Sequence, residues 1–386
     1  MTFSSLNDEL ERLAADGLQR RRRVLDGPQG ARVVADGREY LSFCSNDYLG
    51  LANHPELVEA MQHGAAHYGA GGGASHLVSG HSAAHHRLEE ELAEFVGLPR
   101  ALLFSTGYMA NLGIVTALLG RDDEIFADKL NHASLNDAAL LSRARLTRFP
   151  HLDLEMLEKR LAASRARRKL VLVDAVFSMD GDVAPVSQLL ELCERYDAWL
   201  LLDDAHGFGV LGQGGRGVLE HFGVASPRII YMATLGKAAG VAGAFVAGDA
   251  TLVEYLLQRA RTYIFTTAMP PPLACALSAS LRLIGNEGWR RDRLGGLIAT
   301  LRARLHPQSW RLLDSPTAIQ PLVIGGNQET VAVSDALRAQ GIWVPAIRPP
   351  TVPKGEARLR ISLSASHEIA DVEALAAALN VLEGCA

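Results

Sequence analysis

The chain has 386 residues, of which 48% are hydrophobic and 21% are charged, and its formal net charge is −5. This composition is that of an ordinary globular protein long enough for two or three folding units, and the negative charge argues against binding to nucleic acid. Because no apolar run is as long as a membrane span and the first residues include several acids, we expect neither a membrane anchor nor a secretory signal.

The four cysteines are scattered along the chain, at Cys44, Cys193, Cys275 and Cys385. No two of them form a C-x-x-C pair, so the pattern indicates neither a disulfide framework nor a structural zinc site. Reduced thiols are typical of cytoplasmic proteins, and we therefore expect a cytoplasmic location.

The N-terminal segment is predicted to contain a helix and a hairpin. Residues 3–25 place leucines at helical spacing, which predicts an amphipathic helix. Around residues 32–43, the pair Asp36-Gly37 predicts the turn of a short hairpin. A polar and aromatic loop, residues 45–51, then leads to a helix that begins at about Pro55.

A glycine-rich segment, Gly69–Ser75, satisfies the dinucleotide-binding pattern G-x-G-x-x-A. A helix precedes it where that fingerprint requires a strand, so we interpret it as an active-site loop whose bare backbone lets substrate approach. His81 and His85 follow at i, i+4 in the next helix, which is also the spacing of metal ligands. With no third ligand nearby, we predict a structural or solvent-facing pair and no metal site.

From about residue 100, short apolar runs alternate with helical patterns, which predicts a mostly parallel α/β domain in three layers. The predicted helices include Leu154–Ala163 and Val186–Tyr196. The predicted strands are Leu102–Phe104, Ile125–Ala127, Leu170–Val173, Trp199–Leu202, Ile229–Met232 and Ala244–Val246.

Polar side chains follow several of these strands at the point where each strand ends. Ser105–Asn111 opens a helix, whose free N–H groups and dipole suit a phosphate. Asp128–Ser134, which contains His132, follows the next strand, and Asp174–Gly181 follows another. A lone His132 would more often be a core histidine than a catalyst, but several polar strand ends together favour one shared pocket.

A further strand end carries Asp203 and His206, three positions apart. Taken singly, Asp203 is readily explained as a helix or loop cap, and His206 as a satisfied core histidine. However, Asp203 directly follows a buried strand, and a buried carboxylate is costly unless a cation pairs with it.

Lys237 stands at the end of the next strand, after Thr234 and Gly236. A lysine that loses hydration there has a lowered pKa, and its neutral amine attacks carbonyl groups to form a Schiff base. For Lys237 alone, a side chain that extends into solvent is the alternative. Enzymes that use pyridoxal 5'-phosphate (PLP) pair a Schiff-base lysine with an acid at the ring nitrogen, so Asp203, His206 and Lys237 together favour this cofactor.

The C-terminal part is predicted to be a smaller α+β unit. The prolines Pro270–Pro272 must end a regular element, and a long helix after them leads into this unit. Its predicted strands are Ile319–Ile324 and Arg358–Leu363. Arg358 and Arg360 alternate on one face of the second strand, where Arg360 could present its guanidinium fork to a carboxylate. A surface arginine on an edge strand is the equal alternative.

Six motifs together resemble those of the α-oxoamine synthases, PLP enzymes of fold type I, over essentially the whole chain. They are Asn46–Leu51 (NDYLGL), Asn131–Ser134 (NHAS), Val176–Gly181 (VFSMDG), Asp203–Gly207 (DDAHG), Thr234–Lys237 (TLGK) and Ile347–Pro353 (IRPPTVP). The resemblance implies a mostly parallel seven-stranded sheet in three layers, a smaller C-terminal α+β domain, and a homodimer with its active site at the subunit interface. We expect an N-terminal helix and hairpin segment over residues 1–50, the PLP-binding domain over residues 51–275 and the C-terminal domain over residues 276–386.

By motif position, the resemblance also assigns roles at the cofactor. Lys237 would hold PLP as a Schiff base and later shuttle a proton, and Asp203 would pair with the pyridinium nitrogen. His206 would hydrogen-bond the phenolic oxygen of PLP, and His132 would stack on its ring. The phosphate and the rest of the cofactor would be contacted by Gly107, Tyr108, Thr234 and Ser178.

The resemblance places the substrate at a second group of residues. Arg360, with Asn46, would anchor the carboxylate of the amino acid, and His132 would also contact substrate. The acyl substrate would meet Arg20 and Thr351, with Arg348 beside them. Because Arg20 opens a run of four arginines, which member of that run contacts substrate is left open.

The motif Ile347–Pro353 favours the family member that condenses L-alanine with a pimeloyl thioester, carried by coenzyme A or a carrier protein, in biotin synthesis. Another α-oxoamine synthase such as glycine C-acetyltransferase, an aminotransferase, or a non-catalytic relative are the alternatives. Thr266 and Thr267 fall in the stretch that, in relatives, reaches the phosphate bound to the partner subunit.

Overall fold

The computed structural model describes residues 3–384, and the chain divides into two compact units. The large unit comprises Leu51–Ser178 and Val183–Trp289, and the small unit comprises Met1–Gly50, Met179–Asp182 and Arg290–Ala386. The N-terminal segment is thus grouped with the C-terminal residues. The expected boundary at residue 275 falls inside a helix that packs against two other helices of the large unit.

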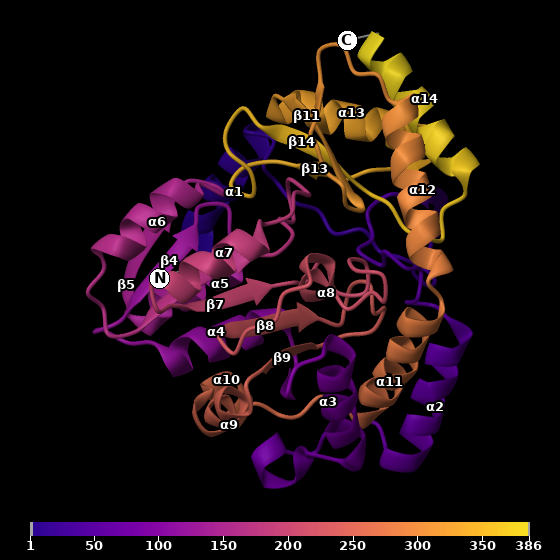
Figure 1. Cartoon of the computed structure of the whole chain (residues 1–386). Coiled ribbons are helices and arrows are strands. Elements are labelled where there is room, and N and C mark those ends of the chain that lie inside the picture. Colours follow the sequence, from indigo (N-terminus) through magenta and orange to yellow (C-terminus); the bar gives the residue numbers. More distant parts are fainter. Residues whose placement is uncertain (1–2, 385–386) are drawn as a thin grey trace. The chain divides into compact units, whose positions relative to one another are not determined.

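The large unit is built on a seven-stranded sheet in the order β3-β9-β8-β7-β6-β4-β5 (Figure 1). All the strands run parallel except β9, which is antiparallel to both of its neighbours. The strands are β3 (Arg100–Phe104), β4 (Glu124–Asp128), β5 (Arg145–Phe149), β6 (Lys169–Asp174), β7 (Trp199–Asp203), β8 (Ile229–Thr234) and β9 (Ala244–Gly248).

All six strands predicted from apolar runs are confirmed, to within two residues at each end. The seventh strand, β5, was not predicted from the residues, although the family resemblance implied seven strands. It lies at the edge of the sheet, and Phe149 is its one fully buried residue. An edge strand exposed to solvent has no reason to be an apolar run, which explains why the pattern was missed.

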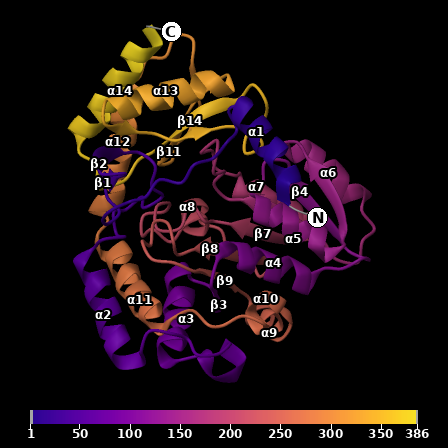
Figure 2. The ribbon, with the colours of Figure 1, turned by 180° about the vertical axis from the view of Figure 1, so that it is seen from behind.

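Helices cover both faces of this sheet (Figures 1 and 2). Alternate strand residues such as Leu102, Leu172 and Met232 form one buried cluster with α4, α5 and α9. Helices α6 and α7 pack against strands of the other face, where right-handed crossovers place them. The helices of this unit are α2 (Pro55–Tyr68), η2 (His76–Gly80), α3 (Ala83–Val96), α4 (Gly107–Leu118), α5 (Ala133–Ser142), α6 (Leu154–Ala163), α7 (Val186–Arg195), α8 (Val218–Phe222), α9 (Ala250–Arg259), α10 (Arg261–Ile264) and α11 (Pro271–Asn286).

The glycine-rich segment is a loop that follows a helix, as predicted. Helix α2 ends at Tyr68, and Gly69 then takes a φ of 79°. A Cβ atom added at Gly72 would lie 2.3 Å from the carbonyl oxygen of Ala268. Glycine is therefore required at position 72 by the close approach of the chain's own backbone at Ala268, whereas the sequence had suggested the approach of a substrate.

The small unit contains two sheets, in the orders β1-β2-β12 and β10-β11-β14-β13. The predicted hairpin is confirmed: Asp36 and Gly37 have φ values of 51° and 77°, as a two-residue turn between β1 and β2 requires. The elements are η1 (Phe3–Leu6), α1 (Asn7–Ala15), β1 (Arg32–Ala35), β2 (Arg38–Ser42), α12 (Trp289–Arg304), β10 (Arg311–Leu312), β11 (Ile319–Gly325), α13 (Asn327–Ala339), β12 (Ile342–Trp343), β13 (Ala346–Ile347), β14 (Ala357–Ser362) and α14 (Ile369–Gly384); α12 begins at the last residue of the large unit.

The prediction of one helix over residues 3–25 is wrong beyond Ala15. Gly17 takes a φ of 66°, which lies outside the helical region and ends α1. Farther on, the N–H of Asp36 donates to the carbonyl of Val24, and the N–H of Asp26 donates to that of Val34. The backbone around residue 25 therefore pairs with β1 instead of continuing the helix.

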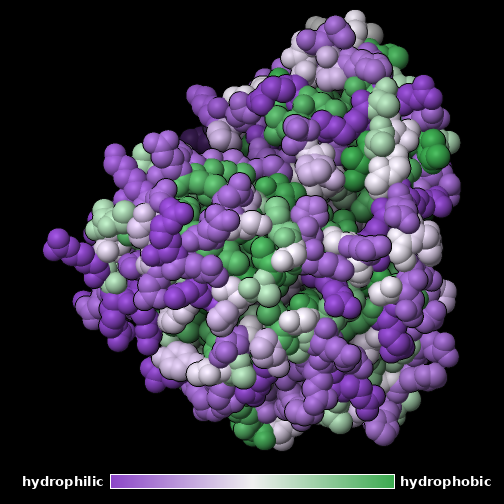
Figure 3. Space-filling view, viewed as in Figure 1, coloured by the Kyte–Doolittle hydropathy of each residue, from purple (hydrophilic) through white to green (hydrophobic). Residues whose placement is uncertain are grey.

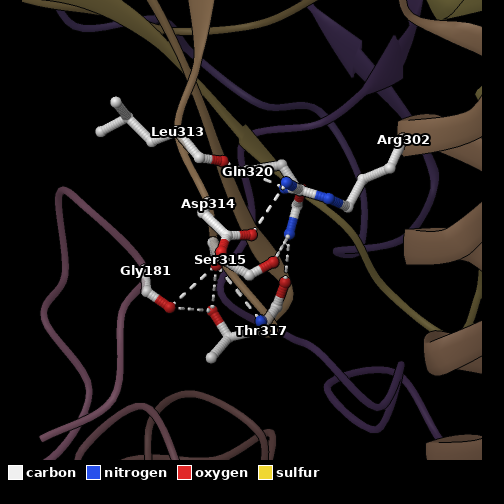
Figure 4. Close-up of polar contacts among 7 residues, drawn as sticks. All are labelled: Gly181, Arg302, Leu313, Asp314, Ser315, Thr317 and Gln320. Carbon is white, nitrogen blue, oxygen red and sulfur yellow. Dashed lines mark hydrogen bonds and ion pairs between the residues drawn. The ribbon is translucent and has the colours of Figure 1, made fainter.

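The short segment Met179–Asp182 belongs to the small unit through a network of polar contacts (Figure 4). The hydroxyls of Ser315 and Thr317 donate to the carbonyl of Gly181 at 2.8 and 3.0 Å. Gln320 donates to the carbonyls of Ser315 and Thr317 and accepts from Arg302. The end of the motif VFSMDG is thus fixed by hydrogen bonds to the loop before β11.

Hydrophilic side chains predominate on the face shown in Figure 3, with smaller apolar areas between them. Among residues 3–384, none of the helices has both the length and the apolar character that a membrane crossing requires.

Candidate active site

The polar residues that follow the parallel strands lie at one edge of the sheet in the large unit. Asp174 at the end of β6 pairs in register with Asp203 at the end of β7, and Asp203 pairs with Met232 of β8. In open α/β sheets, ligands bind at the carboxyl ends of the strands. The shared location predicted from the sequence is therefore present within this unit.

Lys237 lies beside His206 at this edge, with its Nζ atom 2.8 Å from His206 Nε2. A tight turn after β8 fixes the lysine, because the N–H of Gly240 donates to the carbonyl of Lys237 and that of Leu235 donates to Gly243. Lys237 is half-buried and His206 is buried. The amine is thus held against an imidazole instead of extending into solvent.

Asp203 is buried, and hydrogen bonds hold both of its carboxylate oxygens. Oδ1 accepts the N–H of Ala205 at 3.1 Å, and Oδ2 accepts Nδ2 of Asn111 at 2.8 Å. Asn111 also donates to the hydroxyl of Ser134 at 2.9 Å. Sequence reasoning gave Asn111 no role, although a fully buried amide on the otherwise apolar face of a helix is a recognisable signal.

His132 is connected to the same group of residues. Its Nδ1 atom lies 2.7 Å from the hydroxyl of Ser134, and its backbone N–H donates to Asp174 Oδ2 at 2.6 Å. Burial, followed by the charge of Asp203, raises the pKa of Asp174 well above its ordinary value. Two neighbouring buried carboxyl groups do not both ionise readily, so this edge of the sheet suits a cationic ligand atom.

The first turn of α4 suits a phosphate group. The side chain of Thr106 accepts the N–H of Met109, whereas the N–H groups of Gly107 and Tyr108 have no acceptor inside α4. A Cβ atom at Gly107 would lie 2.6 Å from a methyl carbon of Thr234, so the glycine is required by the end of β8. The Tyr108 hydroxyl donates to a carboxylate of α5, and Ser178 lies half-buried in the turn after β6.

The predicted anchor for a carboxylate lies in the small unit. Arg360 is 5% exposed and donates to Asn46 Oδ1 at 3.1 Å, to the Ser362 hydroxyl at 2.7 Å and to the Tyr48 hydroxyl at 3.3 Å. Its strand, β14, lies between β11 and β13. Because Arg360 is buried and β14 is not an edge strand, the alternative of a surface arginine on an edge strand is wrong. Arg358 is buried as well and pairs with Asp180 at 2.8 Å.

The residues predicted at the acyl substrate also lie in the small unit. Arg348 donates to the carbonyl of Gly17, and the N–H of Thr351 donates to the carbonyl of Arg348 at 3.1 Å. Burial, and then the nearby charge of Arg20, lower the pKa of Arg348. Arg20 and Thr351 are exposed. This unit brings the three predicted residues together, but the residues predicted at the cofactor lie in the other unit.

The expectation that His81 and His85 have no third ligand nearby is wrong. His81 precedes α3, and His85 lies in its first turn. His76, from the π-helix η2, places its Nδ1 atom 3.0 Å from Nδ1 of His81. His76, His81 and His85 thus form a cluster of possible metal ligands between η2 and the start of α3. The i, i+4 spacing of His81 and His85 did not indicate that His76 would join them.

The sequence matches the family described as aminotransferase class I and II over residues 38–379. It is 64% identical over 383 residues to an 8-amino-7-oxononanoate synthase from Nitrosomonas eutropha, covering 98% of this chain and 99% of that protein. It is 65% identical over 382 residues to the protein of the same name from Nitrosospira multiformis, covering 99% and 96%.

Solved structures are similar over most of the chain. A serine palmitoyltransferase from Sphingomonas wittichii is 31% identical with a TM-score of 0.91, covering 99% of this chain and 97% of that one. The 8-amino-7-oxononanoate synthase from Francisella tularensis is 31% identical with a TM-score of 0.77, covering 89% and 97%. A serine palmitoyltransferase solved with PLP is 29% identical with a TM-score of 0.92, covering 99% and 98%.

Proposed function

We infer that this chain, which belongs to the class I and II aminotransferases and within them to the 8-amino-7-oxononanoate synthases, joins L-alanine to a pimeloyl thioester with loss of carbon dioxide. The product is 8-amino-7-oxononanoate, a precursor of biotin, and the freed thiol belongs to coenzyme A or a carrier protein. The chain is a PLP-dependent acyltransferase of fold type I. The observation that supports the chemistry best is the contact of Lys237 with His206, at the same sheet edge as buried Asp203.

The residues of the large unit fit PLP in charge and in shape. We propose that Asp203 pairs with the protonated ring nitrogen and that His132 stacks on the ring. The N–H groups of Gly107 and Tyr108 would hold the phosphate, while Thr234 and Ser178 contact the cofactor. PLP supplies an electron sink that stabilises negative charge at the α-carbon of the amino acid.

Two side chains are proposed to handle protons and the covalent attachment. Lys237 Nζ would hold the cofactor covalently, and its amine would accept the proton from the α-carbon of alanine. His206, whose Nε2 atom contacts Lys237 Nζ, hydrogen-bonds the phenolic oxygen of the cofactor. Asn111 keeps the Asp203 carboxylate in position from behind by its hydrogen bond to Oδ2.

The small unit is proposed to bind the substrates. The Arg360 guanidinium, which Asn46 and Tyr48 hold in place, binds the carboxylate of alanine through charge-assisted hydrogen bonds. Arg20, Arg348 and Thr351 contact the acyl thioester. Arg20 lies close enough to Arg348 to lower its pKa, and this clustering of positive charge suits an anionic acyl group or its carrier.

We propose a homodimer in which each subunit contributes to the other's site. Large apolar side chains remain exposed on the large unit, among them Leu140 (63%), Leu141 (60%) and Phe265 (70%). Exposed apolar groups of this size favour burial against a partner. The segment after Phe265, containing Thr266 and Thr267, is proposed to reach the phosphate of the partner's cofactor.

We also propose that the protein works in the cytoplasm. The described cysteines Cys44, Cys193 and Cys275 are free thiols, as in a reducing compartment, whereas Cys385 lies outside the described residues.

Product identification tests the proposed function. The enzyme with PLP, L-alanine and pimeloyl-coenzyme A is expected to form 8-amino-7-oxononanoate, detected by mass spectrometry, together with free thiol. Glycine or serine in place of alanine, and acetyl-coenzyme A in place of the pimeloyl thioester, serve as matched alternatives. A higher kcat/KM for glycine with acetyl-coenzyme A would instead identify a glycine C-acetyltransferase.

A further inference from the structure

We propose that the large unit carries a binding site for a divalent transition-metal ion, formed by His81, His86 and Glu89. One donor atom from each of these three side chains lies within 4.8 Å of the donors of the other two. Two imidazoles and one carboxylate with open positions are a ligand set for zinc and its neighbours in the first transition row. No residue of the proposed synthase chemistry belongs to this group.

The three side chains line one cavity. Its volume is about 420 Å³, and it is bounded by η2, α3, the start of β3, Leu257 of α9 and Tyr263 of α10. His86 is exposed, whereas His81 and Glu89 are half-buried. An ion therefore has an entry path from solvent to ligands that are partly shielded from it.

His76 orients the first imidazole. The His76 ring stacks on Tyr263 with centroids 4.9 Å apart, and its Nδ1 atom lies 3.0 Å from Nδ1 of His81. Because that contact involves Nδ1 of His81, we infer that His81 would offer Nε2 to an ion. A hydrogen bond to the second ring nitrogen is how proteins usually fix the tautomer and direction of a metal-binding histidine.

Glu89 is positioned by the edge of the sheet. Strand β3 lies at the edge of the sheet opposite to β5, and the N–H of Leu103 donates to Glu89 Oε1 at 2.9 Å. Burial raises the pKa of Glu89 to about 7, and a bound cation would favour its charged form. Arg100 also lines the cavity, but its guanidinium pairs with Glu254 at 2.7 Å.

The neighbouring His85 is better suited to a structural role than to ligation. Its Nδ1 atom accepts the N–H of Ser82 in the capping box of α3, and its Nε2 atom lies 2.8 Å from the carbonyl oxygen of Met269. Binding a metal through His85 would break one of these contacts. Burial and nearby imidazoles lower the pKa of His81, which keeps it neutral, the form that binds metals.

Zinc titration of the PLP-loaded enzyme tests the site. After dialysis against metal-free buffer, isothermal titration with zinc chloride is expected to show one ion bound per chain. His81→Ala, His86→Gln and Glu89→Gln are each expected to weaken the Kd at least about 10-fold, because each removes one ligand. His76→Phe, which keeps an aromatic ring beside Tyr263, is expected to weaken the Kd about 10-fold by releasing His81.

His221→Ala, on the exposed side of α8 in the same unit, is the matched control and should bind zinc as the wild type does. His86→Gln removes an exposed side chain, so loss of binding in that variant does not reflect failure to fold. The proposal is overturned if zinc does not bind at a saturable 1:1 ratio, or if His86→Gln and Glu89→Gln bind it unchanged. It is also overturned if zinc changes the visible absorbance of PLP equally in all variants, which would place the ion at the cofactor.

Discussion

The two units carry their proposed site residues in different ways. In the large unit, each cofactor residue lies at or after the end of a strand or opens a helix next to one, and the strands belong to one sheet. In the small unit, the residues come from the extended segment after α1, from the loop at Asn46, from the turn at Arg348 and from the middle of β14. Regular sheet geometry thus assembles the first group, whereas loop packing assembles the second.

The two groups also differ in how firmly they are held. Asp203 and Asn111 are buried and joined by a hydrogen bond. Arg20 and Thr351 are exposed, although Arg360 is as buried as Asp203. A cofactor that stays bound through every turnover is served by a fixed site, while a long acyl chain that enters and leaves is served by exposed residues.

The largest effect is expected from Lys237→Ala. This change removes both the covalent attachment and the proton acceptor, so kcat should fall at least about 10⁴-fold and the visible absorbance of bound PLP should change. Lys159→Ala, on the exposed face of α6, is the control and should behave as the wild type. A Lys237→Ala enzyme with normal turnover and absorbance would refute the role.

The burial of Asp204 in the large unit should make stability depend on pH. Burial raises its pKa to about 7 from 3.8, and its Oδ1 atom is one of the buried oxygens without a hydrogen-bond partner among the described residues. The folded protein thus keeps a proton that the unfolded chain loses above about pH 4. The free energy of unfolding should fall by as much as about 4 kcal/mol between pH 4 and pH 7 through this group.

Urea denaturation at several pH values measures this dependence. Asp204→Asn should flatten the curve between pH 4 and pH 7, while Asp197→Asn, at an exposed position before β7, should leave it unchanged. An unchanged slope in Asp204→Asn would show that Asp204 ionises in the folded protein as it does in the unfolded chain.

Arg360→Lys should weaken the binding of the amino acid without changing the binding of the cofactor. Lysine cannot form the bidentate contact, and the loss of a charge-assisted hydrogen bond should raise the KM for alanine about 10–100-fold. The absorbance of PLP should stay normal, because the cofactor residues lie in the other unit. Arg311→Lys, on an exposed position of β10, is the control; an equal rise in KM there would rule out a specific role.

The smallest effect is expected from Thr351→Val. Removing one exposed hydroxyl should raise the KM for the acyl thioester about 2–10-fold, the cost of a single neutral hydrogen bond, with little change in the KM for alanine. Steady-state kinetics with each substrate varied in turn separate the two. A larger change in the KM for alanine would place Thr351 at the amino acid instead.

Local patterns in the sequence were enough to predict six of the seven strands of the large sheet and to bring out three candidate residues at its edge. An apolar run must be buried, and a parallel strand must deliver the residue after its end to one edge, so Asp203, His206 and Lys237 were recognisable from their neighbours alone. The hairpin at Asp36-Gly37 was predictable for the same reason, since the turn depends on two adjacent residues.

Contacts between distant segments were decided by the tertiary structure alone. Whether Arg360 is buried depends on β11 and β13 flanking its strand, and the partner of Asp203 on α4 lies 92 positions away. The pairing of Arg358 with Asp180 likewise depends on how the chain turns back. The spacing of residues along a chain predicts contacts between near neighbours in the sequence. Contacts between residues that are far apart in the sequence depend on tertiary packing, which cannot be read from a single sequence.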